Sequence, residues 1–301
     1  MTSAEKRCGF VALLGAPNAG KSTLMNALVG AKVSIVTHKV QTTRTRIRGI
    51  AISGQSQIVF VDTPGIFEPK RRLERAMVAA AWGGADSADE LVLIYDAQRT
   101  RRDANTQRII DGLRQRNAKA CLVLNKVDLV KRERLLALAA AFDEEGLFSR
   151  IFMISATEGD GVADLMAHLA AAMPVGPWHY PEDQLSDLSE RLLAAEITRE
   201  KLFLSLHQEL PYALTVETES WEDFEDGSAR LQQVIYVARD SHKAICLGKK
   251  GATIKAVREA AQHDMTQLMG RKVHLFLFVK VKENWLNDPE RYRSWDLEFD
   301  A

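Results

Sequence analysis

The residues Gly15-Ala16-Pro17-Asn18-Ala19-Gly20-Lys21-Ser22 have the spacing G-x-x-x-x-G-K-S/T, which is typical of a loop that binds nucleotide phosphates. Glycine at the first and sixth positions lets backbone N–H groups turn toward an anion, and Lys21 can reach the β and γ phosphates. The Ser22 hydroxyl is placed to hold Mg²⁺, and Thr23 is included among the nucleotide contacts. An apolar run predicts a buried strand at residues 10–14, and residues 22–29 predict a helix whose N-terminus faces the phosphates.

A second segment, Asp62-Thr63-Pro64-Gly65, follows an apolar strand predicted at residues 58–61 and has the form D-x-x-G. Asp62 can hold Mg²⁺ through water, and the Gly65 N–H can sense whether a γ-phosphate is present. Alone the tetrapeptide is weak evidence, because a turn of Asp, Pro and Gly often forms for local reasons.

Two further segments contain groups that can bind the base of a nucleotide. Asn125-Lys126-Val127-Asp128 has the form N-K-x-D, and a carboxylate such as that of Asp128 can accept hydrogen bonds from the N1–H and N2 amino groups of guanine, which adenine lacks. In Ser155-Ala156-Thr157 a backbone N–H can donate to guanine O6. All four segments follow predicted strands, and ligands bind at the carboxyl edge of an open α/β sheet. The sequence therefore predicts a domain that binds GTP or GDP with Mg²⁺.

Composition agrees with a globular protein of two domains. The 301 residues carry no formal net charge, and the three cysteines are isolated, which argues against a disulfide framework or a zinc site and suits a reducing cytoplasm. The first residues are polar and the next apolar stretch is short, so we expect neither a signal peptide nor a transmembrane segment.

Strands and helices alternate along residues 1–173, which predicts an α/β domain with a mostly parallel sheet and flanking helices. Residues 174–187 begin with a proline-rich stretch and are expected to form a linker. Residues 188–285 predict a smaller α+β domain of order α-β-β-α-α-β, in which the acidic residues 219–226 connect two strands. No function is predicted for the tail, residues 286–301.

A G-x-x-G loop, Gly248-Lys249-Lys250-Gly251, lies between two helices predicted in the second domain. It falls in residues 239–282, which hold ten Lys and Arg residues against three acidic ones, and such a loop lets the backbone of single-stranded RNA approach closely. The alternative is an ordinary helix–turn–helix connection. The predicted RNA contacts are these four residues with Ile245, Lys255 and Arg258, beside an apolar groove of Ile245, Leu247, Ile254 and Val257.

From Cys8 to about Trp285 the chain resembles the Era family of bacterial ribosome-assembly GTPases. The resemblance is carried by the four nucleotide segments, by Gln41-Thr42-Thr43-Arg44, by the G-x-x-G loop and by residues 279–285. It implies a GTP hydrolase with a type II KH domain that binds the 3′ end of 16S rRNA and assists assembly of the small (30S) ribosomal subunit. It also implies a cytoplasmic protein that associates peripherally with the inner membrane.

The resemblance further implies a switch within residues 33–48, where Thr43 would close on Mg²⁺ in the GTP state. Thr42 is the rival for this role, and the alternative for the whole stretch is a loop that is merely capped and solvated. Ile66 occupies the position where Ras-like enzymes use a glutamine to orient water, so hydrolysis should be slow or depend on another element. Asn18 suggests K⁺, which a loop asparagine helps bind in related GTPases. The predicted catalytic residues are thus Lys21, Thr43, Gly65 and Asn18.

Two other functions remain open at this stage. One is an RNA-binding protein whose nucleotide site is only structural, against which the intact Lys21, Ser22 and Asp62 argue. The other is a GTPase of the related tRNA-modification or double-G-domain type, which the lack of a second phosphate loop and of a C-terminal cysteine motif disfavours.

Overall fold

The computed structural model describes residues 5–39, 42–206 and 210–301, and these divide into two compact units. The first unit comprises Met1–Ser34, Thr43–Asp187 and Glu290–Ala301, and the second comprises Ile35–Thr42 and Leu188–Pro289. The chain therefore passes from one unit to the other four times. The short segment Ile35–Thr42 belongs to the second unit, although both of its neighbours in sequence belong to the first.

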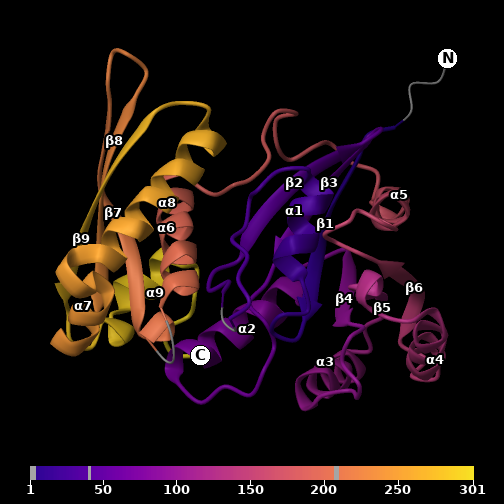
Figure 1. Cartoon of the computed structure of the whole chain (residues 1–301). Coiled ribbons are helices and arrows are strands. Elements are labelled where there is room, and N and C mark those ends of the chain that lie inside the picture. The colour runs from indigo at the N-terminus through magenta and orange to yellow at the C-terminus, as the bar shows by residue number, and fades with distance from the viewer. Residues whose placement is uncertain (1–4, 40–41, 207–209) are drawn as a thin grey trace. The chain divides into compact units, whose positions relative to one another are not determined.

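The first unit is built on a six-stranded sheet of order β2-β3-β1-β4-β5-β6 (Figure 1). Its strands are β1 (Arg7–Gly15), β2 (Ile47–Ser53), β3 (Ser56–Asp62), β4 (Glu90–Asp96), β5 (Ala120–Asn125) and β6 (Phe148–Ile154). Only β2 runs antiparallel to its neighbour, so the mostly parallel α/β sheet predicted from sequence is confirmed. The helices are α1 (Lys21–Val29), α2 (Arg72–Asp86), α3 (Ala104–Gln115), α4 (Arg132–Asp143) and α5 (Val162–Ala172).

The parallel strands are apolar because helices cover both faces of the sheet. On one face, α2, α3 and α4 pack against β1, β4 and β5 in a core that includes Leu14, Leu93, Leu113, Leu122 and Phe142. Helices α1 and α5 contact each other and strands β2 and β3. The carboxyl ends of β1, β3, β4, β5 and β6 consequently meet along one edge of the sheet, where the predicted nucleotide segments begin.

The second unit has the predicted order α-β-β-α-α-β. Its elements are α6 (Glu190–Ser205), β7 (Leu214–Asp223), β8 (Ala229–Val237), α7 (Asp240–Leu247), α8 (Ala252–Met269) and β9 (Val273–Val281). Strand β8 pairs antiparallel with β7 and parallel with β9. Figure 1 shows α6 and α8 on the same face of this sheet, where Ile197, Ala261 and Met265 join strand residues in a buried core.

Two details of the second unit were wrong in the sequence analysis. The acidic residues expected to connect two strands largely belong to β7, which pairs with β8 as far as Asp223 opposite Ala229. Val257, expected to line the RNA groove, is only 1% exposed and packs in the core beneath α6 and α8.

The tail, for which no function is predicted, contains the helix α9 (Pro289–Ser294), and Glu290–Ala301 belongs to the first unit. Across the described residues, no helix combines the length and apolarity needed to span a bilayer. The three cysteines are free and buried, as small hydrophobic side chains would be.

Core packing in the first unit can be tested at Leu113, which is fully buried between α3 and the sheet. Leu113→Ala should lower the free energy of unfolding by about 2–5 kcal/mol, because it leaves a cavity where methyl groups were packed. Leu136→Ala is the matched control, since Leu136 is 64% exposed on α4 and its loss should change stability by less than about 0.5 kcal/mol. Urea denaturation followed by circular dichroism measures both, and equal losses would contradict the assigned core.

Candidate functional site

The phosphate loop connects β1 to α1 and is shaped by two glycines. A Cβ atom on Gly20, whose φ is 99°, would lie 2.2 Å from Asn125 Nδ2, and one on Gly15 would lie 2.7 Å from the Ile94 carbonyl oxygen. Lys21 opens α1 with its side chain buried, and its Nζ donates to the carbonyl oxygens of Gly15 at 3.1 Å and Ala16 at 3.2 Å. The ammonium is thus held inside the loop, where the motif places the phosphates.

The Asp62 carboxylate ends β3 and is fully buried. Its Oδ2 accepts hydrogen bonds from Ser22 Oγ at 2.6 Å, Ser34 Oγ at 3.0 Å and Thr43 Oγ1 at 3.3 Å. The hydroxyls of Ser22 and Thr43 are themselves 3.1 Å apart. Three segments distant in sequence therefore converge on one carboxylate oxygen. The other oxygen, Oδ1, is buried and finds no hydrogen-bond partner among the residues described.

This cluster fits a small divalent cation. Mg²⁺ prefers carboxylate and hydroxyl oxygens, and an unpartnered buried carboxylate oxygen is costly unless something else binds it. The structure also separates the two threonines considered for the switch. Thr43 lies in the cluster, whereas Thr42 Oγ1 bonds to Thr37 Oγ1 at 2.6 Å and to the Lys39 carbonyl at 2.7 Å.

Burial shifts the two charged groups of this site toward neutrality. It lowers the pKa of Lys21 from 10.5 to about 8, although the nearby Asp62 charge acts in the opposite direction. Burial also raises the pKa of Asp62, against the Lys21 charge and the hydrogen bonds of Ser22, Ser34 and Thr43. Both charges are therefore poorly solvated, which strengthens their interaction with a ligand that carries the complementary charge.

Asn125 connects the phosphate loop to the expected base site. Its Nδ2 donates to the Ala19 carbonyl at 3.0 Å, and its Oδ1 accepts from the Ala156 N–H at 3.1 Å. Lys126 Nζ donates to the Asn18 carbonyl at 3.1 Å and to Asp96 Oδ2 at 2.6 Å. Asn125 and Lys126 thus tie the expected base site to the phosphate loop.

Asp128 is exposed in a short turn over Val127–Leu129, where its carboxylate is open to an incoming base. The Ser155 N–H donates to the Asp160 carbonyl at 3.0 Å, and Ser155 Oγ lies 3.2 Å from Thr157 Oγ1. Of the three residues from which a backbone N–H was expected to donate to guanine O6, Ser155 and Ala156 therefore use theirs within the protein.

Three polar residues of the site were missed in the sequence analysis. Ser34 donates to Asp62, Asp96 pairs with Lys126, and Arg99 Nη2 donates to the Pro17 carbonyl at 2.9 Å. Asp96 could have been found, because it ends β4 at the same sheet edge as the four motifs. Ser34 lies within residues 33–48, the stretch expected to contain the switch, but no pattern there singles it out, and Arg99 lies in a loop whose sequence carries no motif.

Gly65 and Ile66 complete the loop after β3. A Cβ atom on Gly65 would come within 3.1 Å of the Pro17 backbone, so a glycine lets this loop pass close to the phosphate loop. The Ile66 N–H donates to the Gly15 carbonyl at 3.2 Å, and its side chain is buried in the core. The Ile66 side chain therefore packs in the core of the first unit, and because it is apolar it cannot orient a water molecule.

The G-x-x-G loop joins α7 to α8 and exposes both lysines. Gly248 has φ 71°, and a Cβ atom there would lie 2.1 Å from Thr253 Oγ1, so only glycine fits. Ile245 is 54% exposed and Lys255 is exposed, as RNA contacts require. The Arg258 guanidinium instead bonds along its own helix, to Gln262 at 3.1 Å and Glu259 at 3.3 Å.

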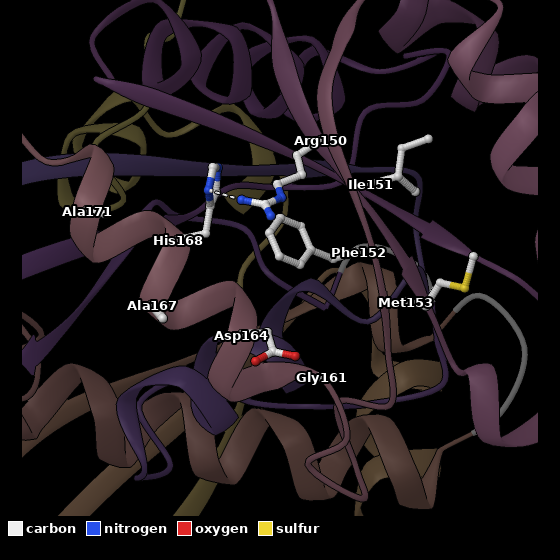
Figure 2. A pocket seen from close by; sticks show the side chains of 9 residues that line it. All are labelled: Arg150, Ile151, Phe152, Met153, Gly161, Asp164, Ala167, His168 and Ala171. Carbon is white, nitrogen blue, oxygen red and sulfur yellow. Dashed lines mark hydrogen bonds between the residues drawn. The ribbon is translucent and has the colours of Figure 1, made fainter.

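A pocket of about 640 Å³ lies between β6 and α5 and is lined by Arg150, Phe152 and His168 among others (Figure 2). Arg150 Nη1 lies 3.4 Å from His168 Nδ1, and the Phe152 and His168 ring centroids are 5.3 Å apart. None of the predicted nucleotide or RNA residues lines it, so it is separate from both candidate sites.

Residues 10–126 match the family described as 50S ribosome-binding GTPase, and residues 209–286 match the KH domain family. Among curated proteins, GTPase Era of Rhizobium meliloti is 61% identical over 293 residues, which cover 97% of this chain and 93% of that protein. GTPase Era of Dinoroseobacter shibae is 59% identical over 300 residues, covering 99% and 97%.

Two solved structures of Era proteins are also similar to this chain over nearly its whole length, at lower sequence identity. An Era structure in complex with MgGDPNP and nucleotides 1506–1542 of 16S ribosomal RNA has a TM-score of 0.91 and 34% identity, covering 98% of this chain and all of that one. A variant of Aquifex aeolicus Era bound to GDP and AlF4⁻ has a TM-score of 0.90 and 33% identity, with the same coverage.

The shifted pKa of Lys21 predicts a pH dependence of stability. Between pH 8 and pH 10.5 the folded protein has released a proton that the unfolded chain still binds, so folding becomes more favourable as pH rises. The free energy of unfolding of the wild type should therefore increase relative to Lys21→Met by on the order of 3 kcal/mol across this range. Urea denaturation at several pH values measures the difference, and parallel pH profiles would contradict the burial of a lysine of lowered pKa.

Proposed function

The chain belongs to the GTPase Era family, and from that premise we propose that it hydrolyses GTP with Mg²⁺ and uses the nucleotide cycle to control binding to the 3′ end of 16S rRNA during assembly of the 30S subunit. In this proposal residues 1–173 bind nucleotide, residues 174–187 link the domains and residues 188–285 bind RNA. The protein would act in the cytoplasm, and peripheral association with the inner membrane is carried over from the family resemblance alone.

The convergence of Ser22, Ser34 and Thr43 on the buried Asp62 carboxylate is the observation that carries the nucleotide part of the proposal. Transfer of a phosphoryl group to water depends on positioning and on neutralising charge. Lys21 would neutralise charge on the β and γ phosphates. Ser22 and Thr43 would hold Mg²⁺ directly and Asp62 through water, and the metal would supply further positive charge to the phosphates.

The buried Ile66 leaves the orientation of water to another element. Asn18, which occupies the phosphate loop with φ 64°, would support hydrolysis in a different way, by helping to bind K⁺ near the phosphates. A cation there would supply the charge that an arginine finger supplies in other GTPases.

The RNA part rests on the G-x-x-G loop. Lys249 and Lys250 are exposed between two helices, where they can neutralise adjacent phosphates while the glycines allow close approach. Ile245 offers apolar surface nearby for an unstacked base. The related Era structure that contains nucleotides of 16S rRNA supports this choice of RNA.

The segment Ile35–Thr42 offers a route by which nucleotide can influence RNA binding. Within the second unit, the Val36 N–H donates to Glu200 Oε1 at 2.8 Å, and the buried Arg199 donates to the Thr42 carbonyl. The residues on either side, Ser34 and Thr43, bond to Asp62. If γ-phosphate and Mg²⁺ order these flanking residues, the segment held on α6 must respond, which is the differential contact that a switch requires.

Guanine recognition can be tested by Asp128→Asn. An amide donates where guanine itself donates, so GTP affinity should fall about 100-fold or more, whereas xanthosine triphosphate, which offers a carbonyl at position 2, should bind better than it does to the wild type. Titration with fluorescent nucleotides measures both. The control is Asp143→Asn, which changes an exposed carboxylate at the end of α4 and should leave both affinities unchanged.

RNA binding can be tested by the double variant Lys249→Glu and Lys250→Glu. Affinity for a single-stranded RNA matching the 3′ end of 16S rRNA should fall at least about tenfold, and the slope of log affinity against log salt should become shallower by about 1.4, because two phosphate contacts are lost. Fluorescence anisotropy with GDPNP and then GDP measures the effect and its dependence on nucleotide. Lys272→Glu with Lys282→Glu introduces the same charge elsewhere in the second unit and should weaken binding far less.

A further inference from the structure

The last twelve residues of the chain return to the first unit, and several of their apolar side chains are buried. Tyr292 is fully buried, Trp295 is 8% exposed and Leu297 is 6% exposed. The Tyr292 ring packs against Trp295 at a centroid distance of 6.1 Å and edge-on against Phe299 at 5.0 Å. Aromatic contacts of this kind give the tail a defined packing of its own, and Glu290–Ala301 belongs to the first unit.

Three arginines of the first unit contact this tail. Arg46 Nη2 pairs with Asp296 Oδ2 at 2.5 Å, and the Arg72 guanidinium lies over the Phe299 ring at 4.3 Å. Arg75 Nε donates to the Ala301 carbonyl at 3.3 Å. The Asp296 carboxylate is 69% exposed, so its ion pair adds orientation more than strength, and the contact of Arg72 with the Phe299 ring attaches the tail to α2.

These arginines follow the two segments that contact the metal and γ-phosphate in the proposed function. Arg46 comes three residues after Thr43. Arg72 and Arg75 lie in the first turn of α2, which the chain enters directly from the loop that follows Asp62 and Gly65. The tail therefore bridges the segment after Thr43 and the helix after Gly65.

The docked tail coexists with a closed arrangement of the site, in which Thr43 Oγ1 lies 3.1 Å from Ser22 Oγ and 3.3 Å from Asp62 Oδ2. We propose that Tyr292–Phe299 is a positioning element that, by holding Arg46 and Arg72 together, stabilises the arrangement of the two switch segments that binds GTP. This inference rests on nucleotide binding by the first unit, as proposed above, and is independent of RNA binding.

Docking of the tail and nucleotide affinity are related by thermodynamic linkage. If docking of the tail raises the affinity for a GTP analogue relative to GDP by some factor, the analogue must favour docking by the same factor. Two independent measurements, nucleotide affinity and exposure of the tail, must then agree. A tail that only stabilises the fold would shift neither the affinity ratio nor its own exposure between nucleotides.

The test uses full-length variants. Phe299→Ala removes the contact over Arg72, and Asp296→Asn removes the pair with Arg46 without disturbing a buried group. The affinity for GDPNP should fall by at least about fivefold in Phe299→Ala, by less in Asp296→Asn, and the affinity for GDP should stay within about twofold. Asp296→Glu should restore the wild-type ratio. The control is Asp288→Asn. Asp288 lies in the second unit just before the tail, and its ion pair with Lys282 is removed by this change, which should alter the affinity for neither GDPNP nor GDP.

Hydrogen exchange of residues 290–301 in the wild type gives the reciprocal measurement, with slower exchange expected in GDPNP than in GDP. An unchanged affinity ratio in both variants, or equal losses for the two nucleotides, would overturn the inference. Exchange of the tail that is the same with both nucleotides would also overturn it. If the wild type binds neither nucleotide, the proposed function itself is refuted. If the wild type binds both nucleotides and the variants bind them equally well, only the inference about the tail is refuted.

Discussion

The buried carboxylate of Asp62 is the constraint on which the arrangement of the first unit depends. A buried charge is tolerated only when other groups compensate for its lost hydration. Here the compensation comes from hydroxyls on three separate segments and from the ammonium of Lys21, itself buried. One oxygen of the carboxylate is still without a partner among the described residues, so the cluster is complete only with a further positive or donating group. Anything that binds there acts on the phosphate loop, on Ser34 and on Thr43 together.

This arrangement explains why Ile35–Thr42 is suited to transmit a signal. The segment is short, and both of its ends are tied to the same carboxylate through Ser34 and Thr43. Within the segment, Val36 and Thr42 are bonded to Glu200 and Arg199, which are buried polar residues of α6 and would be costly to leave unpaired. The bonds to α6 thus lie within two residues of the bonds that Ser34 and Thr43 make to Asp62.

The four nucleotide motifs were predictable because each follows an apolar run, and the carboxyl ends of parallel strands meet at one sheet edge. The Asn125 bridge between Ala19 and Ala156 shows how closely they meet. Ser34 and Arg99 were not predictable, because loops bring them to the site and no local pattern marks them. Val257 was assigned to the groove because it is an apolar residue on the same helix as Ile254. The sequence does not show which apolar residues of α8 face the sheet, and Val257 is one that does. Likewise, acidic residues suggested a connection where pairing with β8 extends β7.

The assignment of Ile35–Thr42 to the second unit has a consequence for biosynthesis. The segment is made roughly 150 residues before α6, the helix that binds it, and at typical rates of translation that interval lasts on the order of ten seconds. During that time the loop has nothing to dock on, while the rest of the sheet can already form. An isolated copy of residues 188–289 would therefore lack the backbone N–H of Val36 and the carbonyl of Thr42, which bond to the buried Glu200 and Arg199. The two units are thus interleaved in the order of their synthesis.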